Sequence, residues 1–274
     1  MLLGGLLLSV CFVTGGNSAH SGAGMLIAQL LSLPILICAV LRGLQTQRLR
    51  PARWAIAVML LIALIPLLQL LPLPMWLWNL PPARQALQHD LGQFGVTGID
   101  YRWSLAPAAT ERSLYSLLPG IALFFSALAT PHSAWRGWLW WLLGLVLFTT
   151  VLAFAQLGAG QHSMLNPFPQ YVPALAGVFA NRDHQASALA IGLVVALTLL
   201  LESLRRIHDP HRPYASLAAC ALLVLLFALV LPLVRSRAGV IIALLMAGAI
   251  WLSSGMFNRQ RLRTHLPTQV MAGA

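Results

Sequence analysis

Long uninterrupted blocks of apolar residues are the feature that most constrains what this chain can fold into. Residues 54–73, for example, contain one glutamine and no charged side chain. The 274 residues are 59% hydrophobic with a mean hydropathy of +0.80, more apolar surface than one soluble core can hide. Hydrocarbon offers no partner to backbone N–H and C=O groups, and the strict alternation of a barrel strand is absent. The predicted fold class is therefore all-α, a polytopic transmembrane helical bundle.

Eight segments are apolar enough to be candidate spans, given that a helix needs about 17 to 25 such residues to cross a bilayer. They cover residues 1–16, 25–41, 54–73, 113–130, 137–157, 186–203, 214–233 and 238–255, and form a single transmembrane domain. The first segment is short and contains Gly4 and Gly5. We interpret it as a retained helix; the alternative is a signal peptide, although no basic residue precedes its apolar stretch.

The basic residues indicate the orientation, because short cytoplasmic loops hold the excess of positive charge. All 17 are arginines. With the N-terminus inside, most of them fall on the cytoplasmic face: Arg42, Arg48, Arg50, Arg53, Arg136, Arg205, Arg206, Arg212, Arg259, Arg261 and Arg263. The segments 74–112 and 158–185 then face the opposite side. We expect a multi-pass bacterial inner-membrane protein with the N-terminus and C-terminus in the cytoplasm and these two segments in the periplasm.

Net charge of +11 does not indicate a nucleic-acid partner, because the arginines are scattered in small groups between apolar blocks. Cys11, Cys38 and Cys220 lie inside predicted spans without paired spacing, so neither a disulfide framework nor a metal site is predicted. Phosphate-cradling glycine loops and nucleophile elbows are missing from the sequence as well. No cofactor is expected, and membrane lipids are expected around the spans.

Two arginine-containing segments carry the functional hypothesis. Asn181-Arg182-Asp183-His184 precedes one predicted span, and Arg235-Ser236-Arg237 interrupts apolar sequence before another. Both are predicted to face the periplasm, although a short turn with two arginines and no acidic neighbour favours the cytoplasm. A bound phosphate would explain that placement, because guanidinium presents a planar donor fork to phosphate oxygens. The alternative is that each arginine anchors a helix end at the headgroup layer.

The neighbouring residues have structural explanations too. Asp183 either neutralises Arg182 or caps the helix that begins nearby. His184 is either a hydrogen-bonded structural histidine or a general base, since imidazole titrates near neutral pH. No partner that would orient it can be assigned from sequence, so the catalytic residue stays unknown with His184 as its candidate. Residues 158–180 have no charge and three prolines, which predicts an irregular, partly buried or re-entrant segment beside Arg182.

Three patterns in the order found here resemble the bacterial O-antigen ligase and O-antigen polymerase superfamily. They are Ser104-Leu-x-Pro-x-x-Thr110, Gly177-x-Phe-x-Asn-Arg-x-His184 and Ser236-Arg-x-Gly239, each placed at the start of a predicted span. The resemblance covers roughly residues 50–255. It implies a glycosyltransferase that takes a glycan from an undecaprenyl-diphosphate carrier and transfers it to a lipid A core, a polysaccharide or a protein acceptor.

The resemblance also implies roles for individual residues. Arg182 and Arg237 correspond to arginines that hold the donor diphosphate and stabilise it as the leaving group, with Arg235 and Asn181 beside them. Many relatives have asparagine where this chain has Asp183, which changes the local charge. The family's large periplasmic loop, bearing the histidine proposed to activate the acceptor, is not found here, and His265 is predicted to be cytoplasmic.

The last departure leaves several interpretations open. The sequence is expected to be a truncated product, a fragment or one half of a split enzyme, and inactive alone in that case. A non-catalytic protein that binds or transports a lipid-linked glycan is an alternative, although no internal repeat typical of transporters is evident. A regulatory or vestigial membrane subunit is the third.

Overall fold

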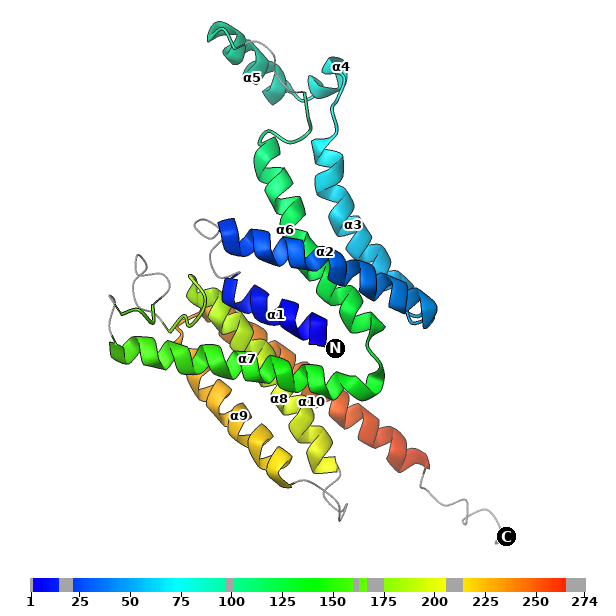
Figure 1. Cartoon of the computed structure of the whole chain (residues 1–274), viewed down its shortest axis with the longest axis vertical. Coiled ribbons are helices and arrows are strands. Elements are labelled where there is room, and N and C mark those ends of the chain that lie inside the picture. The colour runs from blue at the N-terminus through cyan, green and yellow to red at the C-terminus, as the bar shows by residue number, and fades with distance from the viewer. Residues whose placement is uncertain are drawn as a thin grey trace. The chain divides into compact units, whose positions relative to one another are not determined.

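The computed structural model describes residues 2–14, 22–96, 101–159, 163–166, 175–205 and 214–264, with side chains as far as residue 253. Over these residues the elements are helices, connected without a β-strand (Figure 1). They are α1 (Leu2–Thr14), α2 (Gly22–Gln45), α3 (Arg53–Leu70), α4 (Met75–Trp78), α5 (Pro82–Gln93), α6 (Pro107–Ala129), α7 (His132–Ala159), α8 (Arg182–Arg205), α9 (Tyr214–Leu233) and α10 (Arg237–Thr264). The predicted all-α class is confirmed.

Six of the described helices are long and apolar enough to cross a membrane: α2, α3, α6, α7, α8 and α9. The protein is therefore a multi-pass membrane protein. Two shorter apolar helices, Leu2–Thr14 and Arg237–Ser253, correspond to the first and last predicted spans. At a rise of about 1.5 Å per residue, α1 reaches about 20 Å, which is less than the roughly 30 Å of hydrocarbon in a bilayer.

Five of the six spanning helices begin before the apolar blocks that predicted them, and α6 and α8 show the physical reason. Helix α6 begins at Pro107 rather than at residue 113, because proline is well suited to the first turn, where its missing N–H is no loss. Helix α8 begins at Arg182 rather than at residue 186, because Asn181 caps it. Segment 74–112 also contains α4 and α5, which hydropathy did not predict because one is short and the other polar.

The chain divides into two compact units: unit 1 comprises Met1–Cys11 with Ser21–Trp135, and unit 2 comprises Phe12–His20 with Arg136–Ala274. In unit 1, α6 packs against α2 and α3. Two small clusters of buried residues hold this unit together, one of Leu7, Ile35 and Ala122, the other of Ala39, Phe125 and Ala129. Helices α4 and α5 lie beyond the adjoining ends of α3 and α6 (Figure 1).

In unit 2, α8 packs against each of its neighbours. Gly192 lies at the crossing of three helices: a Cβ there would be 2.8 Å from Cγ1 of Val146 on α7 and 3.0 Å from a ring carbon of Phe227 on α9. Only glycine permits so close an approach. Near the other end of α8, Glu202 pairs with Arg136 at the start of α7 at 3.1 Å. The two helices therefore run antiparallel, and the beginning of α8 lies beside the later turns of α7.

Candidate functional site

The first turns of α8 and α10 are packed directly against each other. Gly239 of α10 faces Ala186 of α8, so closely that an added Cβ would lie 2.5 Å from the Cβ of Ala186 and 3.5 Å from its carbonyl carbon. Arg182 is four residues before Ala186, and Arg237 is two residues before Gly239. The structure therefore brings the two arginine segments to the same end of unit 2.

Helix α8 starts at a side-chain cap. The Oδ1 atom of Asn181 accepts a hydrogen bond from the N–H of Asp183 at 2.8 Å, so Asn181 performs the capping that the sequence allowed for Asp183. Asp183, in the first turn, interacts favourably with the helix dipole. Among the described residues no ion pair joins it to Arg182, whose side chain is exposed. The cap fixes the backbone of Arg182 and leaves its guanidinium group available.

Helix α10 starts at a sharp turn. Arg235 has a φ of +57°, a left-handed conformation that residues with a Cβ seldom adopt. Ser236 follows and is buried, with its Oγ accepting the N–H of Gly239 at 3.2 Å. Arg235 and Arg237 on either side of it are both exposed. The buried serine thus directs the two neighbouring arginines away from the helix packing.

The electrostatics of this end of unit 2 favour an anion. The three guanidinium groups of Arg182, Arg235 and Arg237 are permanently charged, and the N-termini of α8 and α10 add partial positive charge. Asp183 is the one carboxylate within the two segments. Guanidinium groups and helix N-termini both bind phosphate through N–H donors. We name Asn181, Arg182, Arg235 and Arg237 the arginine site.

His184 lies at the same end, and its ring contacts Phe179. Its ring is exposed, and its ring centroid is 6.3 Å from that of Phe179, tilted by 55°. Neither ring nitrogen has a hydrogen-bond partner among the described residues. The described part of the chain therefore supplies neither the hydrogen bond of a structural histidine nor the orienting partner of a catalytic one. His265, the other histidine considered, lies outside the described residues.

The segment before α8 is irregular, as predicted, in the parts that the structure describes. Residues 163–166 and 175–181 contain no helix, and Leu175, Gly177 and Val178 are buried. The three prolines that supported this prediction lie outside the described residues. Helix α7 continues to Ala159, beyond the predicted end of the span at 157.

Beneath the arginine site lies a set of buried polar side chains that the sequence did not single out as functional. The hydroxyl of Thr149 on α7 donates to Oε1 of Gln185 on α8 at 2.8 Å and accepts the N–H of Val178 at 3.0 Å. Gln156, also on α7, donates to the carbonyl oxygen of Gly177 at 2.8 Å. Thr149 and Gln185 do not stand out in the sequence, because a single threonine or glutamine in or beside an apolar run gives no indication of its partner.

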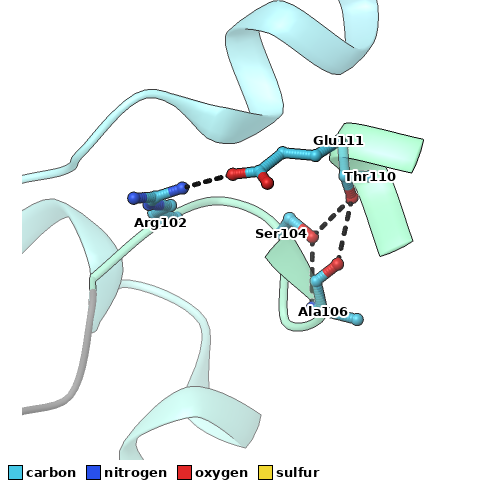
Figure 2. Close-up of polar contacts among 5 residues, drawn as sticks. All are labelled: Arg102, Ser104, Ala106, Thr110 and Glu111. Atoms are coloured by element: carbon cyan, nitrogen blue, oxygen red, sulfur yellow. Dashed lines mark hydrogen bonds and ion pairs between the residues drawn. The ribbon is translucent and has the colours of Figure 1, made fainter. Parts of the chain in front are cut away.

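The Ser104-Leu-x-Pro-x-x-Thr110 pattern is part of unit 1, where it forms the start of α6 (Figure 2). The Oγ of Ser104 accepts the N–H of Ala106 at 3.1 Å and lies 2.7 Å from the Oγ1 of Thr110. Beside them Arg102 and Glu111 form an ion pair at 3.4 Å. The polar residues of this pattern are accounted for by helix initiation, without a ligand.

No protein-family model matches the sequence, and neither a curated protein nor a solved structure matches it. Over the residues described by the structure, no group of three or more His, Cys, Asp and Glu side chains is arranged to hold a metal ion. A functional proposal therefore rests on the arginine site and not on a similar protein.

Proposed function

We propose that the arginine site binds the diphosphate of an undecaprenyl-linked glycan, and that the protein is an O-antigen ligase-like membrane glycosyltransferase that uses this carrier as donor. The observation that carries the proposal is the packing of Gly239 on Ala186, which brings Arg182 and Arg237 to one end of the same unit. Two exposed guanidinium groups, each at a helix N-terminus, supply paired donors for two phosphoryl groups.

The surroundings of the site suit a carrier of this kind. A polyprenyl chain is soluble in the bilayer, and its diphosphate head stays at the surface, where the ends of spanning helices lie. Helices α8 and α9 are long enough to cross the membrane, and α10 begins at the same end of unit 2. We place this end at the periplasmic face of a bacterial inner membrane, with both termini in the cytoplasm, because the arginine distribution favours that orientation.

The proposed chemistry is substitution at the anomeric carbon of the glycan. A hydroxyl oxygen of the acceptor, which is a lipid A core, a polysaccharide or a protein, forms the new bond to that carbon. The bond from carbon to the phosphate oxygen breaks, and its electron pair leaves with the diphosphate. The guanidinium groups of Arg182 and Arg237 stabilise the growing negative charge. The acceptor proton passes to a base, for which His184 is the candidate at this end of the unit.

Binding and transfer by purified protein test the proposal. The protein in lipid nanodiscs is incubated with undecaprenyl-diphosphate-linked glycan, with and without a lipid A core acceptor. Arg182→Ala and Arg237→Ala should each weaken donor binding by about tenfold or more, because a charged hydrogen bond contributes about 1.5 to 3 kcal/mol. Arg112→Ala is the matched control, since Arg112 is exposed, is predicted to face the same side and belongs to unit 1.

The results separate the alternatives. Transfer that is lost in both arginine variants and kept in the Arg112 variant supports the glycosyltransferase. Binding that depends on Arg182 and Arg237 without any transfer supports a carrier-binding or transport protein instead. Donor binding that neither substitution changes overturns the assignment of the arginine site.

A further inference from the structure

A buried polar cluster connects α7 to the chain on both sides of Arg182. We define it as Thr149 and Gln156 on α7, Gly177 and Val178 in the turn before α8, and Gln185 on α8. Thr149 and Gln185 are 0% exposed and Gln156 is 7% exposed. Polar groups this deeply buried cost free energy unless they are hydrogen-bonded, so their contacts define the geometry that the fold maintains.

Thr149 is the centre of the cluster. Its hydroxyl group accepts a hydrogen bond from the N–H of Val178 and donates one to Oε1 of Gln185. One hydroxyl group therefore joins the turn that precedes Arg182 to the helix that begins with it. Seven residues further along the same face of α7, Gln156 donates to the carbonyl oxygens of Gly177 at 2.8 Å and Leu165 at 3.0 Å.

Gly177 allows the turn to approach Thr149. Its φ is +60°, and a Cβ at this position would lie 2.1 Å from Oγ1 of Thr149 and 2.4 Å from its backbone oxygen. Both the conformation and the available space therefore require glycine. The close approach lets the next N–H, that of Val178, reach the threonine hydroxyl.

The presence of glutamine at position 185 is explained by the hydrogen bond that its Oε1 atom accepts, and not by its N–H donors. Its Nε2 atom is buried and has no hydrogen-bond partner among the described residues. An unpaired buried donor is destabilising, and an apolar side chain would avoid that cost. Glutamine at this position is therefore consistent with a need for the hydrogen bond between Thr149 and Oε1.

We propose that Thr149 and Gln185 are positioning residues, which act through the backbone to hold Arg182 in the orientation that binds diphosphate. The inference rests on the proposed function of the arginine site. Val178 is four residues before Arg182 and Gln185 is three residues after it, so the cluster fixes the chain on both sides. The guanidinium group itself is exposed, so its placement depends on the backbone that carries it.

Undecaprenyl diphosphate binding to the full chain in nanodiscs tests the inference through a double-mutant cycle. Thr149→Val keeps the shape of the side chain and removes its hydroxyl, and should weaken binding by about five- to tenfold. Thr149→Ser restores the hydroxyl and should bind within about twofold of the wild type. In an Arg182→Ala background, Thr149→Val should have no further effect, because its action passes through Arg182.

Thr150 provides a matched control. It is the next residue on α7 and 1% exposed, but its hydroxyl donates to the carbonyl oxygen of Val146 within the same helix. Thr150→Val should bind like the wild type. If Thr150→Val weakens binding as much as Thr149→Val, or if Thr149→Val has its full effect in the Arg182→Ala background, the positioning role is overturned.

Hydrogen exchange gives a readout that does not depend on the ligand. The Val178 amide should exchange about tenfold faster in Thr149→Val than in the wild type or Thr150→Val, because it loses its acceptor. Unchanged exchange would overturn the contact on which the inference depends. If Arg182→Ala leaves undecaprenyl diphosphate binding unchanged, the proposed function fails and the positioning role fails with it. The exchange rate of the Val178 amide still shows in that case whether Thr149 accepts its hydrogen bond.

Discussion

Arg182 combines a constrained backbone with an unconstrained side chain. The residue before it caps α8, and the hydrogen bonds of Thr149 hold the chain on both sides. Arg237 has a similar setting, because buried Ser236 caps the first turn of α10 and leaves the arginine exposed. A guanidinium group held this way loses little backbone freedom when it binds a ligand. At this scale the two arginines are suited to binding an anion.

Gly177→Ala is predicted to destabilise the protein. The left-handed φ costs a residue with a Cβ about 1 to 2 kcal/mol, and the clash with Thr149 adds about 1 to 3 kcal/mol. Thermal unfolding of the purified protein in one detergent measures the loss as a lower midpoint. Gly95→Ala is the control, because Gly95 also has a positive φ, +68°, but open space around its Cβ position. Equal effects of the two substitutions would mean that the contact with Thr149 is not tight.

The arginines of the candidate site could be predicted from the sequence, whereas the polar residues that support them could not, and the reason is physical. Arg182, Arg235 and Arg237 were identified because a charge beside an apolar run is costly and therefore conspicuous. Thr149 and Gln185 were not, because their significance lies in a partner 36 positions away. A polar residue in an apolar helix predicts that some hydrogen bond exists, but only the fold determines with which partner.

Among the helices, α8 determines the geometry of the candidate site. It accepts close contacts through small residues, with Gly192 beside α7 and α9 and Ala186 beside α10. Small residues at such crossings let backbones approach in a membrane, where packing rather than water exclusion drives helix association. Hydropathy predicted α8 and α9 as spans but did not predict that Gly239 would meet Ala186, since two small residues carry no partner information.

Gly239→Ala is predicted to separate the first turns of α8 and α10. The new methyl group would lie 2.5 Å from the Cβ of Ala186, and relief of that contact should cost about 1 to 3 kcal/mol of stability. Because the shift also moves Arg237 relative to Arg182, undecaprenyl diphosphate binding should weaken. The measurements are the unfolding midpoint and the dissociation constant in nanodiscs.

Gly248→Ala gives the matched comparison on the same helix. No atom lies within 4 Å of a Cβ at Gly248, so the substitution should be neutral or stabilising by up to about 1 kcal/mol through helix propensity. Gly239→Ala is therefore expected to lower the stability, whereas Gly248→Ala is expected to leave it unchanged or raise it. A Gly239→Ala protein as stable as Gly248→Ala, with unchanged binding, would show that the two helix ends are not closely packed.

For the whole molecule, composition was sufficient to predict the class of fold, because backbone hydrogen bonding in hydrocarbon leaves few alternatives for long apolar segments. It was less informative about connections. Helices α4 and α5 were missed because α4 has only four residues and the twelve residues of α5 are mostly polar. Helix α6 was predicted to begin six residues late, because its first turns contain Thr110, Glu111 and Arg112 and are not apolar.

The proposed function requires the arginine site to face the periplasm, because the acceptors considered for the glycan are found there. Thiol labelling in intact cells tests that requirement. In a variant whose three cysteines, Cys11, Cys38 and Cys220, are replaced by alanine, single cysteines are introduced at exposed positions predicted to lie on opposite faces. Met164→Cys and Ala238→Cys mark the face with the arginine site, and Thr46→Cys marks the other face. Ser236 is unsuitable because it is buried.

A membrane-impermeant thiol reagent should label Met164→Cys and Ala238→Cys in intact cells, and Thr46→Cys only after the membrane is permeabilised. The physical reason is the arginine distribution, since the loop containing Thr46 carries four arginines, Arg42, Arg48, Arg50 and Arg53, and no acidic residue. Arg235 and Arg237 beside Ala238 favour the opposite orientation, but the predicted topology has more arginines, eleven, on the cytoplasmic face. The reverse labelling pattern would place the arginine site in the cytoplasm, where a periplasmic glycan acceptor is out of reach, and would leave a lipid diphosphate as a ligand without the proposed transfer.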